Sequence, residues 1–310
     1  MMTGVVKVKL FIDRLIDEIR RKESHICVGL DPHPDLVPSF LIDQALKEAM
    51  DHSEAWGKAI LTFNKKIIDQ VADITVAVKP QIAFYELIGS HGITALRETI
   101  KYARKKGLLV ILDAKRNDIG STAQAYARAY LGFEGQQELS TADAITINPY
   151  LGFDGIKPFI KDPAKGAFAL LRTSNSTAAE IQDLRLEDGR RVFQAVGDLI
   201  NKWGSSIRGE NGFSNLGAVV GATYPKELHL LREQLPYCFF LIPGYGVQGG
   251  KPGDVVYGFN ADGTGALVNS ARGIIFAYRD LQFPEEEYAL AARTAAVKMR
   301  DEINEVLSYK

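Results

Sequence analysis

Eight short apolar segments, rich in β-branched residues, recur along the 310-residue chain and constrain its fold more than any other feature. Each segment is apolar throughout, a pattern typical of strands that are buried on both faces of a parallel sheet. Such strands need connecting helices to cover the sheet. The segments span residues 26–30, 74–78, 108–112, 144–147, 167–171, 217–220, 238–242 and 266–268.

Segments with the apolar spacing of a helix lie between these strands. Residues 93–106, 187–203 and 226–235 are examples, and the last follows Pro225, as expected for a proline in the first turn. Strands that alternate with helices form right-handed βαβ units, and eight strands close a (β/α)₈ TIM barrel. A doubly wound open sheet is the alternative that the pattern allows.

Two features extend the simple barrel. Apolar residues recur at helical spacing between Phe11 and Ile19, which predicts an extra N-terminal helix rather than a signal peptide. The connection over residues 31–73, between strands 1 and 2, has room for two additional helices. Because no repeat or Pro/Gly/Ser linker divides the chain, we expect a single α/β domain over residues 1–310.

The bulk composition argues against several classes of partner. A formal net charge of −1 provides no field to hold a nucleic acid or a membrane surface. No apolar run reaches the ~20 residues that span a bilayer. Cys27 and Cys238 lie in apolar strands and are expected to be buried free thiols, which suits the cytoplasm. The five histidines show no metal-ligand spacing, so we expect no metal site.

Polar residues follow most of the predicted strands. In TIM barrels the chemistry lies at the carboxyl ends of the strands, so these residues are the candidates for a functional site. They are Asp31, Lys79, Asp113, Lys115, Asp118, Asn148, Thr173, Ser174, Asn175, Asn269, Ser270, Arg272 and Gly273.

The segment over residues 113–118 holds the densest group of charges. Residues two apart on a strand point to the same side, so Asp113 and Lys115 can face one site, with Asp118 in the following loop. Alternating charges from Lys79 to Asp118 would neutralise each other and favour the ammonium form of Lys115, as a general acid requires. A solvated turn after the strand explains the charge pattern equally well.

A glycine-rich loop over residues 244–250 follows strand 7, and Arg272-Gly273 follows strand 8. Glycines let backbone N–H groups approach an anion, and loops 7 and 8 are the usual phosphate site of such barrels. This position favours phosphate binding, although a flexible loop without ligand is the alternative. His33 lies between two prolines, where a structural role is favoured over catalysis.

Residues 112–122 contain the pattern Asp-x-Lys-x-x-Asp. Together with five other segments at successive strand ends, they resemble orotidine 5′-phosphate (OMP) decarboxylases, in the longer bacterial branch of that family. The others are residues 28–32, 78–81, 146–152, 172–175 and 242–250, and all occur in the family's order.

The resemblance implies a cofactor-independent TIM-barrel decarboxylase that converts OMP to UMP and CO₂. Lys115 would protonate C6, beside Asp113, Lys79 and Asp118. The resemblance also implies a homodimer, in which Asp118, Ile119 and Thr122 reach the active site of the neighbouring subunit. The substrate-binding residues would be Asp31 for the ribose, Thr173 or Ser174 for the pyrimidine, Gln248, Arg272 and Gly273 for the phosphate, and Asn148.

Three other functions stay open. Sugar-phosphate decarboxylases and hexulose-phosphate synthases resemble the same pattern but use Mg²⁺, and an acidic residue is expected there in place of Lys79. A Schiff-base aldolase would use Lys115 or Lys79 as a nucleophile. A catalytically inactive barrel could bind nucleotides as a sensor, although such a binder has no need of a costly charged cluster.

Overall fold

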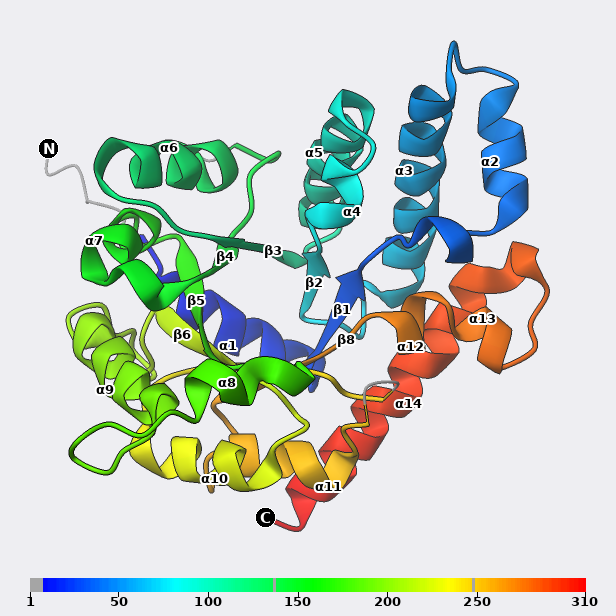
Figure 1. Cartoon of the computed structure of the whole chain (residues 1–310). Helices are drawn as coiled ribbons and strands as arrows, with labels where there is room; N and C mark the ends of the chain where they lie inside the picture. Colours follow the sequence, from blue (N-terminus) through cyan, green and yellow to red (C-terminus); the bar gives the residue numbers. More distant parts are fainter. Residues whose placement is uncertain (1–7, 136–137, 247–248) are drawn as a thin grey trace, which may run out of the picture.

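The computed structural model describes residues 8–135, 138–246 and 249–310. Eight parallel strands hydrogen-bond in sequence order, and β1 pairs with β8 to close the barrel. Helices surround the strands, as Figure 1 shows. The strands are β1 Ile26–Leu30, β2 Ala77–Pro80, β3 Leu109–Arg116, β4 Ala144–Ile147, β5 Gly166–Arg172, β6 Leu216–Val220, β7 Phe240–Pro243 and β8 Ala266–Ser270. The predicted TIM barrel is therefore confirmed, and the open-sheet alternative is wrong.

The predicted helices are also present, with shifted ends. An extra helix precedes β1, and two helices fill the connection between β1 and β2, as expected. Pro225 begins the helix that follows β6. The α-helices are α1 Phe11–Lys22, α2 Ser39–Leu46, α3 His52–Val71, α4 Ala83–Glu86, α5 Ser90–Lys105, α6 Gly120–Leu131, α7 Phe153–Ile156, α8 Ala179–Gln182, α9 Val192–Gly204, α10 Pro225–Gln234, α11 Pro252–Val255, α12 Arg272–Ile275, α13 Ala277–Asp280 and α14 Tyr288–Ser308.

Two apolar layers hold the barrel together. The outer layer packs the helices against the strands, and the inner layer fills the barrel with side chains from all eight strands. Helix α1 contributes Phe11, Leu15 and Ile16 to the inner layer, so it closes one end of the barrel. Burial of these apolar side chains stabilises the fold by about 1.5–3 kcal/mol each.

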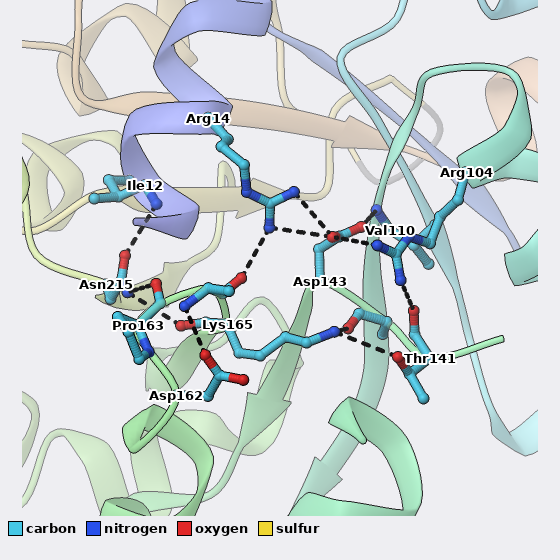
Figure 2. Close-up of polar contacts among 12 residues, drawn as sticks. Ile12, Arg14, Arg104, Val110, Thr141, Asp143, Asp162, Pro163, Lys165 and Asn215 are labelled. Atoms are coloured by element: carbon cyan, nitrogen blue, oxygen red, sulfur yellow. Dashed lines mark hydrogen bonds and ion pairs between the residues drawn. The ribbon is translucent and has the colours of Figure 1, made fainter. Parts of the chain in front are cut away.

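Polar contacts fasten α1 at the amino ends of the strands (Figure 2). The side chain of Asn215, just before β6, accepts from the Ile12 N–H at 2.9 Å. The guanidinium of Arg14 donates to Asp143, just before β4, at 3.2 Å. Asp143 is 1% exposed and also accepts from the Val110 N–H at 3.0 Å. Because α1 seals this end, the opposite, carboxyl end is the open one.

Cys27 and Cys238 are both buried and free, as predicted. Burial raises the pKa of each thiol to about 12. Among the described residues, none of the helices combines the length and apolar character that a membrane-spanning helix requires.

Candidate functional site

A cavity of about 500 Å³ opens at the carboxyl ends of the strands. It gathers residues from β2 to β8 and from the loops after β1, β5, β7 and β8, so its lining is assembled from nearly the whole length of the chain. Its polar lining includes Asp31, His33, Lys79, Gln81, Asp113, Lys115, Thr146, Thr173, Ser174, Asn175, Gln182, Asn269, Ser270 and Arg272. Most of the residues proposed from strand ends therefore meet in one place.

One carboxylate lies between two ammonium groups at the base of this cavity. Lys79 Nζ donates to Asp113 Oδ2 at 2.8 Å, and Lys115 Nζ donates to Asp113 Oδ1 at 2.6 Å. Lys79 and Asp113 are buried, whereas the side chain of Lys115 is 48% exposed. Lys115 is therefore the cation of the group that can meet a ligand.

The charges of this group stabilise one another. Burial raises the pKa of Asp113, but the ammonium groups of Lys79 and Lys115 outweigh burial and lower that pKa well below its usual value. Burial lowers the pKa of Lys79, but Asp113 and Asp31 outweigh burial and raise it. Asp113 thus stays ionised and Lys79 stays protonated across the physiological range.

The backbone of β3 brings Lys115 and Asp113 together by an irregularity. Leu112 pairs with Ile145, but Arg116 pairs with Ile147, so the register between β3 and β4 shifts. Lys115 within this bulge has φ +47°, a left-handed conformation that is uncommon for residues other than glycine. The predicted meeting of the two side chains is confirmed, but strand alternation is not its cause.

Asp31 follows β1 and lies at the edge of the same cavity. It is half-buried, and its Oδ1 atom is buried without a hydrogen-bond partner in the described part of the chain. Burial raises the pKa of Asp31, an effect that Lys79 partly offsets. A buried oxygen without a donor is destabilising, so a ligand hydroxyl that donates to it would be favoured.

The predicted phosphate residues Arg272 and Gly273 follow β8, which pairs with β1, and they line the same cavity. Arg272 begins α12 and is exposed, and its guanidinium has no ion-pair partner within the described residues. Gly273 and Gly244 line the cavity beside it. In the described residues at the two ends of the glycine-rich loop, the Gly250 N–H donates to Gly244 O at 3.0 Å. Gln248 lies outside the described residues.

The hydroxyl groups of Thr173 and Ser174, just after β5, differ in their hydrogen bonding. The Thr173 hydroxyl accepts from Gln182 Nε2 at 2.7 Å and donates to Asn175 Oδ1 at 2.6 Å. In the described parts of the chain, the Ser174 hydroxyl has no hydrogen-bond partner, and it lines the cavity. Of the two, Ser174 is the one free to bind a ligand.

Comparisons with known proteins agree with this arrangement. A model of the "Orotidine 5'-phosphate decarboxylase / HUMPS family" matches residues 24–282. The OMP decarboxylase of Clostridium acetobutylicum is 42% identical over 301 residues, which cover 96% of this chain and 100% of that protein. That of Caldicellulosiruptor bescii is 39% identical over 305 residues, or 96% of this chain and 99% of that protein. The chain belongs to the OMP decarboxylase / HUMPS family.

The fold of this family is shared with solved structures. The Leishmania donovani OMP decarboxylase superposes with a TM-score of 0.73 at 33% identity and covers 96% of this chain and 98% of that one. The family resemblance inferred from six segments of sequence is therefore confirmed along nearly the whole chain.

Four of the residues that the family resemblance singled out do not line the cavity of their own chain: Asp118, Ile119, Thr122 and Asn148. The first three lie at the start of α6 or just before it, and Asp118 Oδ1 accepts from the Ile119 N–H at 2.7 Å. Asn148 Oδ1 accepts from the Tyr150 N–H at 3.0 Å. Among the described residues, the ion pairs of the array join Asp113 to Lys79 and Lys115, and the part of Asp118 stays a prediction.

Three cavity residues were not singled out from the sequence, and two of them contact the Lys79–Asp113–Lys115 group. Gln81 Nε2 donates to Asp113 Oδ2 at 3.0 Å. Thr146 Oγ1 donates to Asp113 Oδ1 at 2.8 Å, and Gln182 binds Thr173. A hydroxyl within the apolar run of β4 was the one signal that could have identified Thr146.

Proposed function

We propose that this chain decarboxylates OMP to UMP and CO₂, the last step of UMP biosynthesis, as one catalytic domain in the cytoplasm. The observation that carries the proposal is the ionised Lys79–Asp113–Lys115 group at the base of the cavity, with Lys115 open to a ligand. Near-full-length relatives that bear the name of this enzyme support it.

The substrate would span the cavity from Arg272 to Lys115. The phosphate binds Arg272 and Gly273, together with Gln248, since a guanidinium matches phosphate oxygens with two parallel hydrogen bonds. A ribose hydroxyl donates to the unpartnered Oδ1 of Asp31. The pyrimidine accepts from the free hydroxyl of Ser174, while Thr173 stays bound to Gln182.

The chemistry breaks the bond between C6 and its carboxylate. The electron pair of this bond stays on C6, CO₂ leaves, and a proton moves from Lys115 Nζ to C6. A fixed ammonium stabilises the developing negative charge at C6 before it gives up the proton. Asp113 and Lys79 hold that ammonium in place, so the protein's own side chains supply the stabilisation and no cofactor is required.

We further propose a homodimer in which Asp118, Ile119 and Thr122 complete the site of the neighbouring subunit, with Asn148 at the same surface. None of these residues is among those that line the cavity of their own chain, and Ile119 is 60% exposed. Asn117 Nδ2 donates to Asn148 O, which joins this loop to the segment of Tyr150 and Phe153. Tyr150 is 86% exposed, so both segments that this hydrogen bond joins carry exposed apolar side chains.

A Mg²⁺-dependent sugar-phosphate reaction is the main rival within the family. An enediolate reaction would need carboxylate oxygens free to bind the cation. Here ammonium groups occupy both oxygens of Asp113, and Lys79 stands where an acidic residue is expected. This donor set favours the OMP reaction.

The proposal is tested by incubating the protein with OMP in D₂O and analysing the pyrimidine product by NMR. Proton transfer from an exchanged Lys115 predicts UMP with one deuterium at C6 and an equimolar release of CO₂. Unchanged OMP beside a correctly folded protein would contradict the proposal, as would activity confined to sugar phosphates with Mg²⁺.

A further inference from the structure

Thr146 lies at the centre of the charged group although it carries no charge. It belongs to β4 and is 2% exposed. Its hydroxyl accepts from the Ala114 N–H at 3.1 Å and from the Lys115 N–H at 3.0 Å, and it donates to Asp113 Oδ1 at 2.8 Å. A hydroxyl has one proton and two acceptor sites, so all of its hydrogen-bonding capacity is used here.

The bulge in β3 explains why this position needs a hydroxyl. Leu112 pairs with Ile145 and Arg116 pairs with Ile147, so residues 113–115 lie opposite Thr146 alone. The N–H groups of the bulge have left the strand ladder, and a buried N–H without an acceptor is destabilising. The left-handed conformation of Lys115, at φ +47°, also persists only where its surroundings hold it.

We propose that Thr146 is a positioning residue for the reaction: its hydroxyl holds the β3 bulge and so directs Lys115 and the carboxylate of Asp113 toward C6 of the substrate. This inference rests on the proposed function, because it requires Lys115 to act at C6. Thr146 acts through Lys115 and Asp113, and its effect belongs to the chemical step rather than to substrate binding.

Two substitutions separate the hydroxyl from the shape of the side chain. Thr146→Val keeps the β-branched shape, which suits a strand, but removes the hydroxyl. Thr146→Ser keeps the hydroxyl and removes a methyl group. We expect Thr146→Val to lower kcat about 100-fold, because a misplaced catalytic group loses about this much. We expect Thr146→Ser to stay within about fivefold of the wild type, and both variants to keep UMP affinity within about threefold.

The experiment measures kcat and KM for OMP decarboxylation, the UMP affinity and the folded fraction of the wild type and both variants. A residue that only supports the fold would lower the folded fraction, but kcat per folded molecule would not change. Wild-type kcat in Thr146→Val, or equal losses of kcat in the Val and Ser variants, would overturn the proposal. A 100-fold loss of UMP affinity would also overturn it, because binding would then be the affected step.

A third variant covers the case in which Thr146→Val does not fold. Thr146→Cys has a similar size but a thiol that is a weak donor and acceptor. We expect its kcat to lie at least about tenfold below that of Thr146→Ser, and equal kcat values for the two would overturn the proposal. A wild type that folds, binds UMP and fails to decarboxylate OMP would refute the proposed function itself, and the role of Thr146 with it.

Discussion

At the scale of single residues, Asp113 organises the site. Its two carboxylate oxygens accept hydrogen bonds from Lys79, Lys115, Gln81 and Thr146. These four bonds use the hydrogen-bonding capacity of the carboxylate. A buried carboxylate is tolerated because these donors replace water. Its charge holds the ammonium of Lys115 at the open side of the group, where a substrate can reach it.

Lys115→Ala should abolish turnover and spare the binding of UMP. The variant removes both the ammonium that stabilises C6 and the proton that replaces the carboxylate, so we expect kcat to fall by about 10⁴-fold or more. The UMP affinity should change by less than about tenfold, because the contacts proposed for Arg272 and Asp31 involve the phosphate and the ribose and are kept. Steady-state kinetics and calorimetric titration with UMP check both expectations, and wild-type-like turnover would remove Lys115 from the mechanism.

Arg272→Ala should mainly weaken phosphate binding. A charge-assisted hydrogen bond contributes about 1.5–3 kcal/mol, so we expect UMP to bind about 10- to 100-fold more weakly. Arg279→Ala is the matched control, because Arg279 is also exposed but does not line the cavity. Uridine, which lacks the phosphate, should bind both variants and the wild type alike. Equal UMP affinity in Arg272→Ala and the control would place the phosphate elsewhere.

The sequence predicted the charged residues of the site better than the neutral ones. Lys79, Asp113 and Lys115 follow apolar strands, where a charge is conspicuous. Thr146 and Gln81 were missed because hydroxyl and amide groups are common in strands without any function. The bulge at Lys115 was missed too, since Ala-Lys-Arg carries no glycine to mark a left-handed residue.

At the scale of secondary-structure elements, α1 and α8 are additions that support the barrel. Helix α1 closes the amino end of the barrel, where its Arg14 donates to Asp143 (Figure 2). Helix α8 lies in the long connection after β5 and brings Gln182 to Thr173. The ion pair between Arg172 and Asp183, at 3.2 Å, fastens this connection to the end of β5.

Asp143→Ala should destabilise the fold without changing the chemistry. It removes the acceptor for Arg14 and for the Val110 N–H in a buried setting, so we expect the free energy of unfolding to fall by about 3–5 kcal/mol. Asp280→Ala, at an exposed position, should change it by less than about 0.5 kcal/mol. Urea unfolding measures both values. A change below about 1 kcal/mol in Asp143→Ala would contradict this role for the cluster.

Prediction of the elements succeeded where the apolar pattern was strong. The segments at residues 26–30 and 144–147 coincide with β1 and β4. The strand expected at residues 74–78 is instead β2 at Ala77–Pro80, so Thr75 and its neighbours precede the strand. The purpose of the connection after β5 was not predicted, because no sequence pattern indicated that Gln182 contacts Thr173 at the end of the strand.

At the scale of the whole molecule, the proposed dimer has a direct test. Asp118→Ala and Lys115→Ala homodimers should each be nearly inactive, because every site lacks one of the two groups. Mixed subunits should regain activity, because a hybrid dimer carries both defects in one site and none in the other. With random pairing, about a quarter of the wild-type sites are restored. A mixture that stays inactive while hybrids form would show that Asp118 does not act across the interface.

The central claim is that this protein decarboxylates OMP with its own side chains. The most direct measurement treats the purified protein with EDTA, adds OMP and follows the ultraviolet band of the orotate ring. We predict that the band is lost at the same rate with and without EDTA, and that UMP accumulates as it disappears. An unchanged band with a folded protein, or a reaction that returns only when Mg²⁺ is added, would contradict the claim.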